Sequence, residues 1–155
     1  MPGFKIRRAT AKDIDLLVEH RHKMFEEMKR PDAKSLKIAD ESYREWAVAM
    51  MKRHLFYGYI VTSGRRLIAA SGCVWIREVQ PSPGRPKGRV PYVLSMYTSP
   101  EFRRNGLATM ILKEATKWAN ERGYDKMTLH ASSVGRKVYS QLGWTRTWEM
   151  EKRLK

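Results

Sequence analysis

The spacing of apolar residues changes soon after the start of the chain. Residues 4–9 alternate between apolar and mostly basic side chains, which is typical of a strand. From residue 14 to residue 28 the apolar residues recur every three or four positions, which predicts an amphipathic helix. Thr10 and Asp13 approximate a capping box at the start of this helix, and Pro31 marks its predicted end.

A polar stretch and a second amphipathic segment follow. Residues 29–40 are mostly polar and predict a connector, whereas residues 42–54 return to the helical spacing. The apolar residues of this second predicted helix share one face, and they are Tyr43, Trp46, Ala47, Met50 and Met51. Two helices therefore separate the first strand from the rest of the chain.

The rest of the chain changes several times between the strand and the helix pattern. Strands are predicted at 56–61, 66–79, 90–98, 126–131 and 144–153, and helices at 105–122 and 133–142, with a loop rich in proline and glycine at 80–88. The predicted order is β-α-α-β-β-β-α-β-α-β, which indicates a single α/β domain over residues 1–155 with a mixed central sheet. The unit from residue 90 to residue 131 is expected to be a parallel crossover.

Composition narrows the class of protein. The 155 residues carry a formal net charge of +15, and no apolar run approaches the roughly 20 residues that a membrane span needs, so we expect a cytoplasmic protein without membrane contact. The basic residues are scattered, so nucleic acid is not expected as the main partner. No Cys/His set has the spacing of a metal site, and the one cysteine, Cys73, is expected to be buried.

The segment around Gly106 carries the clearest chemistry. A predicted strand leads into a short turn, Arg103 and Arg104, and then a helix whose first turn contains no acidic residue. The start of a helix binds phosphate readily through free backbone N–H groups, and Gly106 and Ala108 are small enough for an anion to approach. On these residues alone, an anion site and a plain glycine-containing turn remain equally open.

Two motifs add to this interpretation by their resemblance to motifs of a known family. Arg103-x-x-Gly106-x-Ala108 resembles the Q/R-x-x-G-x-G/A motif of the GNAT N-acetyltransferase superfamily, and Tyr139 with Leu142-Gly143-Trp144 resembles the family's Y-x-x-L-G-F/W segment. The resemblance covers residues 90–148 closely and the N-terminal half only in the order of its elements. It implies a single-domain GNAT fold and acetyl-CoA as co-substrate, without a metal.

The resemblance also implies residues that bind acetyl-CoA. The backbone of Met96, Tyr97 and Thr98, at the family's strand bulge, would pair with the pantetheine arm. The pyrophosphate would lie on the loop and first helical turn, and the full set of implied cofactor-binding residues is Met96, Tyr97, Thr98, Arg103, Arg104, Asn105, Gly106, Leu107, Ala108, Thr109, Arg136 and Tyr139.

Two residues are candidates for acid–base catalysis. Tyr139 is the candidate general acid for the leaving thiolate, although a half-buried aromatic residue that only packs would look the same in the sequence. His130 is the candidate general base, with a hydrogen-bonded strand histidine or a water relay as alternatives. Glu26 and Glu27 are expected to be solvated.

The sequence therefore predicts an N-acetyltransferase that transfers the acetyl group of acetyl-CoA to a primary amine by direct attack in a ternary complex. The acceptor amine is not specified, and the resemblance suggests a homodimer. The alternative is a catalytically silent acyl-CoA-binding protein of the same fold that docks on nucleic acid or ribosomes through its basic surface.

Overall fold

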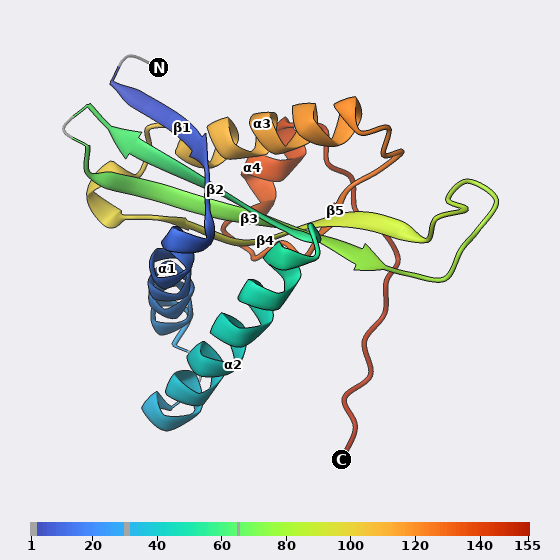
Figure 1. Ribbon diagram of the computed structural model, residues 1–155, viewed down its shortest axis with the longest axis horizontal. Coiled ribbons are helices and arrows are strands. Elements are labelled where there is room, and N and C mark those ends of the chain that lie inside the picture. Colours follow the sequence, from blue (N-terminus) through green and yellow to red (C-terminus); the bar gives the residue numbers. More distant parts are fainter. Residues whose placement is uncertain (1–2, 30–31, 65) are drawn as a thin grey trace.

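A five-stranded sheet forms the centre of the protein, in a computed structural model that describes residues 3–29, 32–64 and 66–155 (Figure 1). The strand order is β1-β2-β3-β4-β5, in which the first four strands are antiparallel neighbours and β5 is parallel to β4. The strands are β1 (Phe4–Arg8), β2 (Phe56–Ser63), β3 (Ile68–Glu78), β4 (Arg89–Thr98) and β5 (Thr128–Leu129). The strands predicted at 56–61 and 66–79 form as β2 and β3 and pair antiparallel, and the predicted parallel unit is confirmed.

Helices cover both faces of the sheet. The helices α1 (Ile14–Glu27) and α2 (Ala33–Lys52) lie on one face, and α3 (Leu107–Glu121) and α4 (Arg136–Gln141) lie on the other (Figure 1). Successive side chains of β3 lie on alternate faces of the sheet. Cys73 packs in the cluster between the sheet and the helices α1 and α2, and Val74 packs in the cluster between the sheet and α3. This double coverage explains why the central strands are apolar almost throughout.

The predicted capping box is confirmed. Thr10 and Asp13 bond reciprocally, with the Thr10 backbone N–H donating to Asp13 Oδ2 at 2.8 Å. They cap a short 3₁₀ turn, Ala11–Asp13, that leads directly into α1. Arg7 of β1 adds a bidentate ion pair to Asp13, so the start of α1 is fixed against the first strand.

The predicted connector at 29–40 is wrong from residue 33 onward, because α2 already begins at Ala33. Asp32 caps this helix, accepting from the Ser35 backbone N–H at 2.9 Å and from the Ser35 hydroxyl at 2.7 Å. Leu36 then turns into the core. A good cap and a single buried apolar residue outweigh the polar composition, while the predicted helix end at Pro31 lies outside the described residues.

The C-terminal elements are shorter than predicted. The strand predicted at 126–131 is reduced to the two residues of β5, and the helix predicted at 133–142 is reduced to α4. The last predicted strand, 144–153, does not form within the described residues; Trp144 packs against the core, whereas Trp148 and Met150 are exposed. In the described part of the chain no helix is long and apolar enough to cross a membrane.

Candidate active site

The loop before α3 presents a run of free backbone donors. Arg104 and Gly106 adopt left-handed conformations, with φ of 65° and 70°, which bend the chain into the first turn of α3. Within the described residues, the N–H groups from Arg104 to Thr109 donate no hydrogen bond, and no acidic side chain lies in the first helical turn. Consecutive free N–H groups at the positive end of a helix dipole form a concave anion site.

Two side chains of the motif hold this loop in shape. Arg103 donates from Nε to the Thr98 carbonyl at 3.0 Å and from Nη2 to both carboxylate oxygens of Glu27 at 2.6 and 2.7 Å. Asn105 donates from Nδ2 to the carbonyls of Phe102 and Arg103. Glu27 is exposed, as expected, but its carboxylate also pairs with Arg103 and so joins α1 to the loop.

The strand that leads to the loop is irregular at its centre. Cys73 faces Leu94 and Ser71 faces Tyr97, so β4 bulges at Ser95 and Met96, and Ser95 has a φ of 54°. The bulge thus begins just before the segment 96–98 that the sequence pointed to. Gly72 lies opposite the bulge because any Cβ there would meet Met96 Sδ at 2.3 Å.

The parallel strands β4 and β5 separate soon after they pair. Their only register partners among the described residues are Tyr92 with Thr128 and Val93 with Leu129. Beyond Val93, the edge of β4 that faces β5 has no strand partner in the described chain. The bulge, the free edge and the donor loop therefore follow one another along the same stretch of chain, from Leu94 to Thr109.

Tyr139 lies on α4 with its ring against the core and against Trp144, at a centroid separation of 6.1 Å. The ring also covers Gly135, where an added Cβ would meet Tyr139 Cε2 at 2.8 Å. Burial raises the pKa of Tyr139 above its usual value, and the hydroxyl donates no hydrogen bond to any described residue. The phenol therefore keeps its proton at neutral pH.

The other predicted residues take varied positions. His130 is exposed and follows β5 directly, where the two parallel strands have separated. Leu107 is buried, so only its backbone N–H is open to the loop, and Arg136 is exposed at the first position of α4. Cys73 is buried as expected, and burial raises the pKa of its thiol to about 12.

One buried polar contact was not anticipated from the sequence. His20 of α1 is 3% exposed, and its Nδ1 lies 2.8 Å from Ser71 Oγ on β3, opposite the bulge. Its ring packs against that of Tyr97 at a centroid separation of 4.8 Å and a tilt of 55°, and burial lowers the pKa of His20. The spacing of three residues from Leu17 places His20 on the inward face of α1, and this spacing was the available sequence indication.

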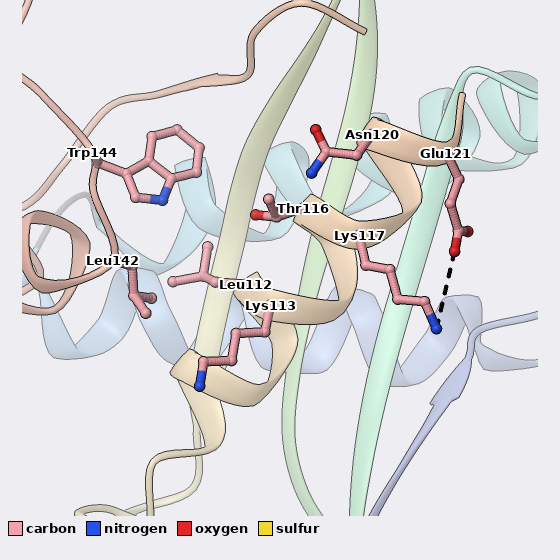
Figure 2. Close-up of a pocket in the computed structure, with 8 residues that line it drawn as sticks. All are labelled: Leu112, Lys113, Thr116, Lys117, Asn120, Glu121, Leu142 and Trp144. Atoms are coloured by element: carbon pink, nitrogen blue, oxygen red, sulfur yellow. Dashed lines mark ion pairs between the residues drawn. The ribbon is translucent and has the colours of Figure 1, made fainter. Parts of the chain in front are cut away.

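An open groove on α3 is separate from these residues. Leu142 and Trp144 face Leu112 and Thr116 of α3 across a space of about 510 Å³ (Figure 2). None of the predicted site residues lines it. Among the described residues there is also no cluster of three or more His, Cys, Asp or Glu that could hold a metal ion.

Solved structures of similar architecture are known. A comparison with curated protein sequences finds no match. Among solved structures, a GCN5-related N-acetyltransferase from Ralstonia eutropha JMP134 is 28% identical, with 98% of this chain and 99% of that chain covered and a TM-score of 0.88. A predicted acetyltransferase from Clostridium acetobutylicum, with acetyl-CoA, is also 28% identical, with 97% and 96% covered and a TM-score of 0.87.

More distant structures share the fold alone. An aminoglycoside 6′-N-acetyltransferase from Acinetobacter haemolyticus is 18% identical, with 97% of each chain covered and a TM-score of 0.70. The family described as acetyltransferase (GNAT) matches residues 18–144, which include β2 to β5, α3 and Tyr139. The mixed sheet, in which the parallel strands β4 and β5 separate, and the loop of free backbone N–H groups agree with this match. The chain belongs to the GNAT acetyltransferase family.

Proposed function

We propose that this protein is an N-acetyltransferase that moves the acetyl group of acetyl-CoA to a primary amine by direct attack in a ternary complex. The observation that carries the proposal is the run of free N–H groups from Arg104 to Thr109, directly after a strand edge that has lost its partner. We further propose that residues 1–155 act as one domain.

The donor side of the site suits a diphosphate attached to an extended, amide-containing arm. The free N–H groups of the loop would donate hydrogen bonds to the phosphate oxygens, and Arg104 and Arg136 are the proposed sources of additional positive charge. The backbone of Met96, Tyr97 and Thr98 would pair with the amides of the pantetheine arm. The Clostridium acetobutylicum relative, of similar fold, carries acetyl-CoA.

The chemistry needs few side chains. The neutral amine nitrogen attacks the thioester carbon, the C–S bond breaks, and the sulfur leaves as a thiolate. Tyr139 would donate its hydroxyl proton to that sulfur, which its raised pKa permits because the phenol is protonated at neutral pH. Much of the acceleration would come from holding the amine and the thioester together.

The amine must also lose a proton. His130 is the proposed general base, directly or through water, because it lies exposed at the point where β4 and β5 have separated. The buried His20 is a poor candidate, since it is 3% exposed and engaged with Ser71. Its contact with Tyr97 suits a positioning residue behind the bulge instead.

Calorimetry and a thiol-release assay test this proposal together. Acetyl-CoA should bind, and CoA thiol should appear when a panel of small amines and peptide amines is added. Absence of acetyl-CoA binding would contradict the donor site. Binding without turnover for any amine would instead favour the silent acyl-CoA-binding alternative, which an electrophoretic shift with RNA would then support.

A further inference from the structure

A second open groove, which we call the basic groove, lies at the end of the sheet opposite the loop that precedes α3. It offers a space of about 520 Å³ and is lined by residues of β1, β2, α2 and the C-terminal end of α3. Because α2 and α3 cover opposite faces of the sheet, the basic groove crosses the end of the sheet between them (Figure 1). Trp118 lines it about 16 Å along α3 from Leu107, at 1.5 Å per residue. It is therefore separate from the loop of free N–H groups.

Positive side chains border the basic groove without acidic partners. Arg8, Lys52 and Arg122 line it, and among the described residues no aspartate or glutamate does. Within the same part of the chain, none of the three takes part in an ion pair. The C-terminal ends of α2 and α3 each bring about half a negative charge nearby. Three positive side chains less these two helix ends leave a net charge of about +2.

Two of these cations lie against one indole ring. The guanidinium carbon of Arg8 is 5.2 Å from the ring centroid of Trp118, and that of Arg122 is 5.7 Å from it. Arg8 also lies 4.4 Å from the ring of Tyr59. Such cation–π contacts position the two guanidinium groups, but they do not neutralise them. Like charges held this close repel each other, so an anion between them would be stabilised.

Three buried polar groups at this place have no hydrogen-bond partner in the described chain. They are Arg8 Nη1, the Tyr59 hydroxyl and Trp118 Nε1. Tyr59 is 1% exposed, and Trp118, which also lines the basic groove, is 8% exposed. Burial raises the pKa of Tyr59 to about 12, with a further contribution from the charge of Glu114, so the phenol keeps its proton. Buried donors without an acceptor are unfavourable, which favours a ligand that brings acceptor atoms.

The other side of the basic groove is apolar. Val48 and Met51 of α2 line it, together with Ala9 and Ala11 from the segment after β1. A small inorganic anion would leave these side chains in water, whereas a ligand with an apolar part would cover them. The volume is in the range of small-molecule sites. Charge and apolar surface together therefore indicate an anion that is attached to an apolar body.

We propose that the basic groove binds a small phosphate monoester whose organic part is apolar. A phosphate monoester carries about 1.5 to 2 negative charges at neutral pH, which matches the net charge of about +2, while a carboxylate would neutralise only half of it. Arg8, Lys52 and Arg122 would donate to the phosphate oxygens, and the organic part would lie on Val48 and Met51. Arg122 is exposed, so its side chain is free to move off the indole and admit an oxygen to Trp118 Nε1.

Calorimetry on the full chain, with acetyl-CoA at saturation, tests the class of ligand. Phenyl phosphate and butyl phosphate carry the same anion on an aryl and an alkyl body, and the tighter of the two identifies the body. Inorganic phosphate lacks the apolar part and phenylacetate lacks the second charge, so each should bind at least tenfold more weakly than the better ester. Equal affinity for either of them, or no binding of either ester, would overturn the proposal.

Two matched variants test the charge. Lys52→Gln removes one positive charge from the basic groove, and Lys113→Gln removes one from α3 outside it. Both lysines are exposed, so circular dichroism should show both variants folded. Lys52→Gln should weaken binding of the better ester about fivefold, at the upper end for one exposed charge pair, and Lys113→Gln should leave it unchanged. Unchanged affinity in Lys52→Gln, or an equal loss in both variants, would contradict the proposed site.

The indole N–H signal of Trp118 locates the ligand. In the ¹⁵N-labelled full chain, with the indole signals assigned by sequential connectivity, the better ester should shift the signal of Trp118 and leave that of Trp144, which lines the α3 groove, in place. An unmoved Trp118 signal, or shifts confined to Trp144 or to the loop before α3, would refute the proposal. The spectra are recorded with and without acetyl-CoA, so a chain that does not bind acetyl-CoA still gives a result.

Discussion

Replacing Tyr139 by Phe separates the chemical role of this residue from its packing. The ring packs against Trp144 and over Gly135, and Phe keeps both contacts. The hydroxyl has no partner among the described residues, so its removal should change the free energy of unfolding by less than about 0.5 kcal/mol. Any large effect of Tyr139→Phe must then come from the lost proton donor.

The size of the expected effect follows from the two pKa values. A CoA thiol has a pKa near about 8.5, and a phenol near about 10. Because burial raises the pKa of Tyr139 further, full proton transfer to the thiolate is uphill by at least about 2 kcal/mol. The benefit therefore falls at the low end of general acid catalysis, and we expect Tyr139→Phe to lower kcat by about 100-fold.

Steady-state thiol release measures this effect. The KM for acetyl-CoA should stay close to the value of the unaltered protein, because the loop donors are unchanged. Tyr124→Phe is the matched control, since burial also raises the pKa of Tyr124 while its ring packs on Trp118 at the far end of α3. An unaltered kcat in Tyr139→Phe, or an equal loss in Tyr124→Phe, would remove Tyr139 from the proposed mechanism.

Three further predictions concern the loop and the start of α1. Gly106→Ala and Gly123→Ala both place a side chain at positive φ, 70° and 75°, so each should lower the free energy of unfolding in urea by about 1–2 kcal/mol, but only Gly106→Ala should weaken acetyl-CoA binding in calorimetry. Glu27→Gln should lower the free energy of unfolding by less than about 1 kcal/mol, because both partners of its ion pair are about 45% exposed. The same change should weaken acetyl-CoA binding, because the loop loses its attachment to α1. Tighter binding would show instead that a released Arg103 contacts phosphate itself. The hydrogen bond from Arg7 lowers the pKa of Asp13 to about 2 from 3.8, so its stabilisation is complete above pH 3.8 and is lost as the pH falls through 2; urea unfolding should show a loss of about 1–2 kcal/mol over this interval that Asp13→Asn lacks.

The sequence predicted those parts of the fold that local patterns determine. The period of apolar residues found α1, α3, the C-terminal part of α2 and the central strands, and the motif around Gly106 located the free backbone N–H groups at the start of α3. The left-handed conformations of Ser95 and Arg104 carry no such indication, because neither is glycine. The pairing of Arg103 with Glu27 spans 76 residues and depends on how α1 crosses the sheet, which no local pattern encodes.

The C-terminal segment shows a different limit. The alternation of apolar residues at 144–153 predicts a strand, but the segment forms none. A period of two specifies which side chains share a face, and it does not specify a neighbouring strand for the segment to pair with. At the start of α2, by contrast, a helix forms where the sequence pattern predicted none. Asp32 and Ser35 form a good cap, but the polar residues around them favoured the prediction of a connector.

The short pairing between β4 and β5 has a consequence for the order in which substrates bind. Two residue pairs are all that joins β5 to β4 in the described ladder, so the part of the chain that carries His130 and Tyr139 should open locally at a small free-energy cost. A donor lying along the free edge of β4 would add rungs to that ladder and make the acceptor side rigid. We therefore expect compulsory order in the kinetics, with acetyl-CoA first, and slower amide hydrogen exchange in β5 and α4 once it is bound.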